Sequence, residues 1–161
     1  KINSIVYGGG QERNIRSGTL NVPGIVGFAK AVEIAIDDMD AENKKYKKWT
    51  DTMLEKFSAV GGKLNGHLTN RLVHNLNIRF DGVQSKSIIN TVSKKLAISA
   101  GSACTSDLVE PSHVLLALGL SEKQAHNSIR IGCNRFNTDK EIDFAITEIL
   151  NALKSIAKIR V

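Results

Sequence analysis

The chain has 161 residues, a length typical of one domain, with 42% hydrophobic and 24% charged residues. No apolar run approaches the roughly 20 residues that a membrane-spanning helix needs, and no charged-then-apolar leader is present. Two cysteines are too few for a disulfide framework. The composition predicts a soluble protein of a reducing compartment, for which we expect the cytoplasm and no membrane partner.

The net charge of +6 makes nucleic acid a class of partner to consider. Four of the lysines lie within residues 44–48, on the polar face of a predicted helix, where solvated charge is the ordinary interpretation. Aromatic residues make up only 5% of the chain, which leaves little surface for base stacking. We therefore expect no direct nucleic-acid partner.

A long helix is predicted after a glycine-rich opening. Apolar residues recur at helical spacing, at Ile25, Phe28, Ala29, Val32, Ile36 and Met39. Pro23 suits a first helical turn, a second apolar stripe begins at Trp49, and Gly61 and Gly62 stop the pattern. We expect this helix, over 23–60, to link two structural regions.

A half-buried strand is predicted over 72–80. Its even positions are Leu72, His74, Leu76, Ile78 and Phe80, which alternate with polar residues. A lone histidine in such a strand is expected to pack there, and no second metal-type residue stands at a helpful spacing. The sequence therefore predicts no metal site.

Short helices and strands are predicted for the rest of the chain. We expect a helix over 87–96, a brief strand over 97–99, a loop of small residues over 100–110 and a helix from Pro111 to Gly119. A strand over 128–133 follows, and two capping boxes open the helices on either side of it, at Ser121 with Gln124 and at Thr138 with Glu141. The pattern is mixed α and β, without repeats.

One cysteine lies in a setting that favours reactivity. Cys104 is surrounded by small and hydroxylated residues over 99–106, which cannot bury a thiol well. Cys133, by contrast, shares a strand face with Ile129 and Ile131 and is expected in the core. Local composition alone leaves a nucleophile and an ordinary loop cysteine about equally supported at Cys104.

Two further features carry weak signals for anion binding. Strand alternation places Arg130 on the face opposite Ile129, where a guanidinium can meet a planar carboxylate, although a surface ion pair is the commoner role. Residues 8–13 and 16–21 offer backbone amides, hydroxyl groups and positive charge ahead of a helix. Glycines there can equally make a simple turn.

Taken together, these motifs resemble the cysteine desulfurases of the class V aminotransferase family. The motifs, in order, are Gly8-Gly9-Gly10-Gln11-Glu12-Arg13, Arg16-Ser17-Gly18-Thr19, Gly101-Ser102-Ala103-Cys104, Glu110-Pro111-Ser112, Ile129-Arg130 and Arg135-Phe136. The resemblance extends over essentially all of the chain and is closest to the branch that supplies sulfur for iron-sulfur clusters and tRNA thiolation. Gln11 stands where many relatives have histidine.

The resemblance implies the C-terminal part of a fold-type I transferase that depends on pyridoxal phosphate and forms a homodimer. Residues 1–22 would end the large cofactor-binding domain, 23–60 would form the linking helix, and 61–161 would form a small α+β domain with a small mixed sheet flanked by helices. No lysine here follows Ser-x-His, the context of the cofactor-bearing lysine in this family. That lysine is expected upstream of Lys1, so this chain alone is expected to be inactive.

The resemblance also implies roles for three residues. Cys104 would be the catalytic cysteine that takes sulfur from L-cysteine as a persulfide and leaves L-alanine, Arg130 would hold the substrate carboxylate, and Thr19 would reach the cofactor phosphate of the partner subunit. Acceptor proteins such as an iron-sulfur scaffold would then take the sulfur. Two alternatives stay open: a selenocysteine lyase or related transaminase of the same fold, and a non-catalytic domain that dimerises or docks acceptors.

Overall fold

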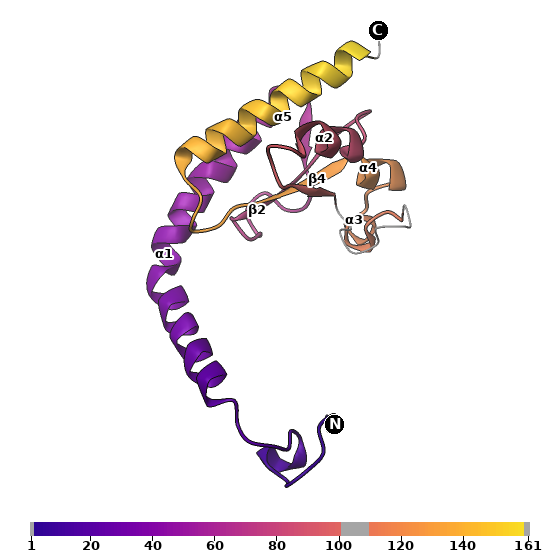
Figure 1. Cartoon of the computed structure of the whole chain (residues 1–161). Helices are drawn as coiled ribbons and strands as arrows, with labels where there is room; N and C mark the ends of the chain where they lie inside the picture. Colours follow the sequence, from indigo (N-terminus) through magenta and orange to yellow (C-terminus); the bar gives the residue numbers. More distant parts are fainter. Residues whose placement is uncertain (1, 101–109, 160–161) are drawn as a thin grey trace. The chain divides into compact units, whose positions relative to one another are not determined.

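The computed structural model describes residues 2–100 and 110–159, so that Cys104 and its motif lie outside the described residues. The chain divides into two compact units, Lys1–Asp40 and Ala41–Val161. Figure 1 shows the elements of both units in sequence colours. Within the described parts of the chain, no helix combines the length and the apolar character that a membrane crossing requires.

The first unit begins with a loop that folds back on itself. A parallel bridge joins Val6 to Arg16, and the 3-10 turn η1, Glu12–Asn14, lies between them. All three residues of η1 have positive φ angles, of 51°, 55° and 61°. Side-chain hydrogen bonds hold the loop closed, because Gln11 Oε1 accepts from the amide of Gly18 at 2.8 Å.

Helix α1, Val22–Ser58, confirms the predicted long helix. Asn21 caps its start, since Oδ1 accepts from the amide of Gly24 at 3.1 Å. The helix ends before Gly61, which adopts a φ of 87° that favours glycine. The apolar stripe of its first half is exposed along its length, at Ile25, Phe28, Val32, Ile36 and Met39.

The second unit contains a four-stranded sheet in the order β1-β2-β4-β3. Its strands are β1 Gly62–Leu64, β2 Asn75–Phe80, β3 Ser99–Ala100 and β4 Ser128–Gly132. We expected a mixed sheet, but all three pairings are antiparallel. The reason is that β4 lies between β2 and β3. Helix α2, Ser85–Val92, connects β2 to β3, which run in the same direction but are not neighbours in the sheet.

One face of this sheet carries the hydrophobic core. Leu76 and Ile78 of β2 and Ile129 of β4 have no exposed surface, and they form a single cluster with residues of three helices. These helices are the second half of α1, α2, and α5, Asp139–Ile159. The odd-numbered positions of β2 lie on the opposite, polar face of the sheet.

The short elements follow the predicted order with shifted bounds. Strand β2 begins at Asn75 rather than at Leu72, because the amide of Asn75 donates to the carbonyl of Leu72 at 3.3 Å and turns the chain there. Leu72 is consequently 67% exposed instead of buried. Helix α2 begins and ends earlier than expected, β3 lies one to two residues later, and α3, His113–Ala117, begins two residues after Pro111.

Both predicted capping boxes are present. At the start of α4, Glu122–His126, the Ser121 hydroxyl accepts from the amide of Gln124, whose side chain accepts from the amide of Ser121. Thr138 and Glu141 exchange the same pair of hydrogen bonds at the start of α5, at 3.3 and 2.8 Å. These two helix starts were therefore predicted correctly from spacing alone.

Candidate functional site

Arg130 lies on the polar face of the sheet, as the alternation of β4 predicted. Its neighbours Ile129 and Ile131 are buried on the core face, whereas Arg130 is exposed. The guanidinium makes no hydrogen bond or ion pair with any residue in the described ranges 2–100 and 110–159. An exposed guanidinium that no carboxylate of the described chain neutralises is chemically suited to an anionic ligand.

The sheet register shows which residues adjoin Arg130. Asn77 of β2 lies opposite Arg130 on one side, and Ser99 of β3 lies opposite it on the other. Residues that pair across a sheet project from the same face, so these two polar residues share the polar face with the guanidinium. The Cys104 motif begins directly after β3, and Cys104 itself lies outside the described residues.

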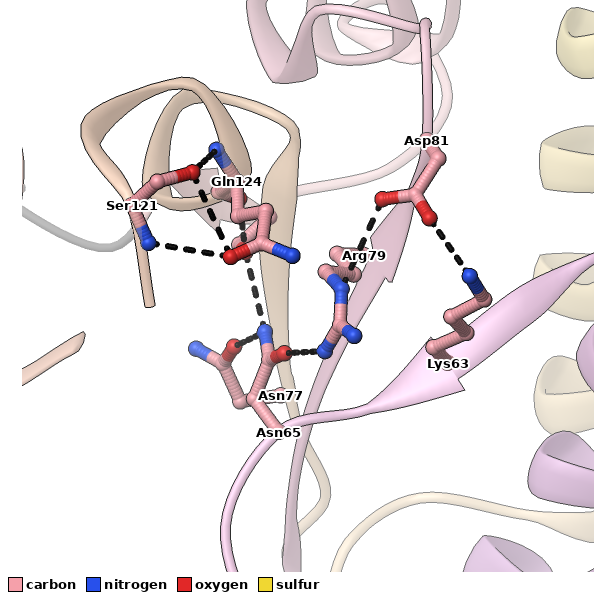
Figure 2. A network of polar contacts seen from close by, with 8 residues as sticks. Lys63, Asn65, Asn77, Arg79, Asp81, Ser121 and Gln124 are labelled. Atoms are coloured by element: carbon pink, nitrogen blue, oxygen red, sulfur yellow. Dashed lines mark hydrogen bonds and ion pairs between the residues drawn. The ribbon is translucent and has the colours of Figure 1, made fainter. Parts of the chain in front are cut away.

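A hydrogen-bond network covers the neighbouring part of this face, and Asn65 is its centre (Figure 2). The Nδ2 atom of Asn65 donates to Oδ1 of Asn77 at 2.7 Å and to the hydroxyl of Ser128 at 2.9 Å. Its Oδ1 atom accepts from Nη1 of Arg79 at 2.7 Å. Ser128 is fully buried and donates to the carbonyl of Gln124 at 2.7 Å. The network therefore joins β2 to β4 two residues before Arg130.

The network continues through Arg79 to an acidic group at its edge. Arg79 Nε forms an ion pair with Oδ1 of Asp81 at 3.5 Å. This contact does not have hydrogen-bond geometry, so the buried Nε atom has no hydrogen-bond partner among the described residues. Lys63 contacts the other oxygen of Asp81 at 2.7 Å. The hydrogen bond from Lys63 lowers the pKa of the Asp81 carboxyl, with Arg79 adding to the effect. The guanidinium of Arg79 thus contacts Asn65 through Nη1 and Asp81 through Nε.

Cys133 is confirmed as a core residue. Its side chain is 6% exposed, and its amide donates to the carbonyl of His74 at 2.8 Å. Burial raises the pKa of the Cys133 thiol. His74 is half-buried with its ring against that of Tyr46, which agrees with the expected packing role. Within residues 2–100 and 110–159, no three histidine, cysteine or acidic side chains gather as metal ligands would.

Thr19 lies in the loop of the first unit, where the polar groups mostly bond one another. Arg16 donates through Nη1 to the carbonyls of Gly18 and Thr19 at 3.1 and 2.8 Å, and the Ser17 hydroxyl accepts from Gly10. The hydroxyl of Thr19 is exposed and has no hydrogen bond to the described residues. A hydroxyl in this state can donate to a phosphate oxygen.

The described residues fit a phosphate better than they fit the rest of a pyridoxal cofactor. No lysine of the described chain is buried, and Lys45, the most enclosed of those that are described, donates to the carbonyl of Arg135 at 3.1 Å. A buried or shielded amine is what a covalent bond to the cofactor would need. Among the residues whose burial the structure describes, the exposed Thr19 hydroxyl is free to meet a phosphate, and no lysine has the enclosed setting that a covalent cofactor bond would need.

The sequence alone did not single out Asn65 and Asn77, although Asn77 pairs with Arg130 across the sheet and Asn65 is bonded to Asn77. Asn77 is one of the polar residues that alternate along the predicted strand, and Asn65 lies in the loop after β1. A strand pattern gives the face of a residue but not its partner across the sheet. The available signal was that two asparagines and an arginine occupy one face of a short strand.

Comparisons with known proteins agree on one family. Residues 3–144 match the family model described as Aminotransferase class-V. The chain is 46% identical over 147 residues to a cysteine desulfurase IscS of Methylobacillus flagellatus. The matched region covers 91% of this chain and 36% of that relative. The chain is 42% identical over 163 residues to a cysteine desulfurase IscS of Rickettsia typhi, which covers 99% of the chain and 39% of the relative.

A solved structure shows a similar fold. A NifS-like protein superposes with a TM-score of 0.80 at 31% identity, over 94% of this chain and 39% of that protein. The chain therefore spans less than two fifths of the length of these relatives. The family model covers far more than half of the chain, and pyridoxal-phosphate dependence is implied by that family. The chain belongs to the aminotransferase class-V family.

Proposed function

We propose that this chain is part of a pyridoxal-phosphate-dependent cysteine desulfurase, with Cys104 as the residue that receives sulfur. The observation that carries the proposal is the exposed guanidinium of Arg130, without an ion-pair partner in the described chain, on the strand that pairs with β3. The identity of 46% to a cysteine desulfurase, over 91% of the chain, supports the same activity.

Arg130 is proposed to hold the carboxylate of L-cysteine through two parallel N–H donors. Fixing the substrate in this way orients its sulfur toward an attacking thiolate and reduces the entropy cost of the reaction. Bound pyridoxal phosphate would supply an electron sink for the substrate carbon. The Thr19 hydroxyl is proposed to donate to the phosphate of the cofactor in the partner subunit, which implies a homodimer.

The proposed sulfur transfer balances without an added oxidant. The Cys104 thiolate attacks the substrate sulfur, a sulfur–sulfur bond forms, and the bond between the substrate carbon and sulfur breaks. The electron pair of the broken bond stays with the carbon, which takes up a proton, and L-alanine leaves. The persulfide on Cys104 then passes its outer sulfur to an acceptor protein such as an iron-sulfur scaffold. A reducing compartment, the cytoplasm, is the proposed location.

The test measures intact mass and cofactor absorbance of the full-length protein after incubation with L-cysteine. The wild type is expected to gain about 32 Da in a thiol-sensitive form, and Cys104→Ala is expected to gain nothing. Cys133→Ala is the matched control, because it removes the second cysteine of the 161-residue chain and should leave the gain intact. The isolated 161-residue chain is expected to bind no cofactor covalently.

Other outcomes would reject the proposal. A full-length protein that binds no cofactor, or that gains sulfur equally without Cys104, would favour a domain that only dimerises or docks acceptors. Release of alanine from L-selenocysteine but not from L-cysteine would favour a selenocysteine lyase.

A further inference from the structure

Asn77 and Arg130 form a close pair on the polar face of the sheet. Asn77 is opposite Arg130 in the register of β2 and β4. The carbonyl of Asn77 accepts from the amide of Asn65 at 2.9 Å, which means that its main-chain groups point toward β1 and away from β4. The two residues therefore form a non-hydrogen-bonded pair, in which Cα atoms are about 4.5 Å apart and side chains are closest.

The amide group of Asn77 is held in one orientation. Its Oδ1 atom accepts from Nδ2 of Asn65 at 2.7 Å, and Asn65 is itself fixed by Ser128 and Arg79. Figure 2 shows the Nδ2 atom of Asn77 on the side away from Asn65. That nitrogen has no hydrogen-bond partner in the described ranges, and Asn77 is partly exposed. Two N–H donors are thus directed by the network and left for a ligand.

We propose that Asn77 is a second carboxylate-binding residue, whose side-chain amide donates to the carboxylate that Arg130 holds. A carboxylate has about four lone-pair sites, and a bidentate arginine occupies two of them. A neutral amide beside the guanidinium can fill a third site without adding charge. In this arrangement Asn65 acts through Asn77 and is a positioning residue. The inference rests on the proposed function, because it takes Arg130 as the residue that holds the carboxylate of the substrate.

The experiment compares two ligands that differ only in the carboxylate. The full-length protein with its cofactor carries Cys104→Ala, so that sulfur transfer does not deplete the ligand. The dissociation constants of L-cysteine and of cysteamine, which lacks the carboxylate, are measured from the change in cofactor absorbance. A residue that binds the carboxylate affects only L-cysteine, whereas a residue that merely supports the sheet affects both ligands.

Asn77→Ala is expected to weaken L-cysteine binding about tenfold, the effect of losing one hydrogen bond to a charged group. Cysteamine binding should change less than about twofold. Asn77→Asp is the sharper variant, because it keeps the acceptor for Asn65 and nearly the same volume but places a negative charge beside the substrate carboxylate. It is expected to weaken L-cysteine binding by about a hundredfold or more and to leave the thermal unfolding midpoint close to that of the parent.

Asn75→Ala is the matched control. Asn75 is the same residue type on the same face of β2, two positions away and opposite Gly132 instead of Arg130. Its removal should leave the binding of both ligands unchanged. The inference is overturned if the Asn77 variants bind L-cysteine normally, if they weaken both ligands equally, or if Asn75→Ala has the same effect. Failure of the proposed function itself would be seen separately, as the absence of sulfur on Cys104 in the protein that retains it.

Discussion

The surroundings of Cys133 decide what its thiol can do. The side chain is 6% exposed, and burial raises its pKa because the charged thiolate is poorly solvated there. The thiolate is the reactive form, so at neutral pH Cys133 should react with iodoacetamide far more slowly than a free thiol. In the 161-residue chain with Cys104→Ala, we expect no alkylation by mass spectrometry in the folded state over minutes, and one adduct after unfolding in urea.

The wild-type 161-residue chain is the comparison for this labelling experiment, and it should take up one label in the folded state at Cys104. Labelling of Cys133 in the folded Cys104→Ala chain at the rate of a free thiol would contradict the burial of Cys133. The same experiment repeated at a higher pH should show little gain at Cys133 until the protein opens, because a raised pKa and restricted access act together.

The burial or exposure of single residues could be predicted from the sequence where strand alternation determines it. The two-residue period of β4 gave both the burial of Cys133 and the exposure of Arg130, because it depends only on local geometry. The pairing of Asn77 with Arg130 could not be predicted in this way. It depends on the register between two strands that are about 50 residues apart in the chain, which no local pattern contains.

The capping box at the start of α5 makes a contribution to the free energy of unfolding that depends on pH. Glu141 accepts from the amide of Thr138, and this hydrogen bond, followed by the one from the Thr138 hydroxyl, lowers the pKa of Glu141. A carboxyl with a lowered folded-state pKa stabilises the fold above its unfolded pKa of about 4.3, and the contribution is lost as pH falls through the folded value. Glu141→Gln should therefore reduce the free energy of unfolding near pH 7, and the difference from wild type should shrink below about pH 4.

Urea unfolding followed by the fluorescence of Trp49 measures this difference, since Trp49 is the one tryptophan in the sequence and is 2% exposed. Glu122→Gln is the control, because Glu122 is an acidic residue in the first turn of α4 without the capping role that Gln124 has there. A difference between wild type and Glu141→Gln that stays constant from about pH 7 to pH 3 would argue against the ionised capping box.

Elements with strong local signals were predicted well, and those defined by tertiary pairing were not. Both capping boxes and the stop of α1 at Gly61 follow from side-chain chemistry and a positive φ, which are local properties. The start of β2 was wrong by three residues because the turn at Leu72 interrupts a pattern that looks continuous. The antiparallel pairing throughout the described sheet depends on where β4 inserts, which the order of elements along the chain does not reveal.

At the scale of the whole molecule, the apolar residues are divided unevenly between the two units. The core cluster belongs to the second unit, around Trp49, Met53 and Phe57 of α1 and the sheet. The stripe between Ile25 and Met39 was predicted from its helical spacing, yet its side chains are exposed. Periodicity predicts that a helix has an apolar face but not which surface covers that face.

An exposed apolar face makes a monomer prone to associate, and this gives a prediction for the 161-residue chain in isolation. Phe28, which is 72% exposed, is the largest side chain of the stripe. Phe28→Glu should lower the binding of an apolar dye and reduce light scattering, while the urea midpoint reported by Trp49 stays within error of wild type. Asn43→Glu is the matched control, because it adds the same charge at an exposed polar position of the same helix. Equal effects of the two variants would attribute the change to charge alone. A lowered urea midpoint in Phe28→Glu only would instead show that Phe28 is buried in the folded chain.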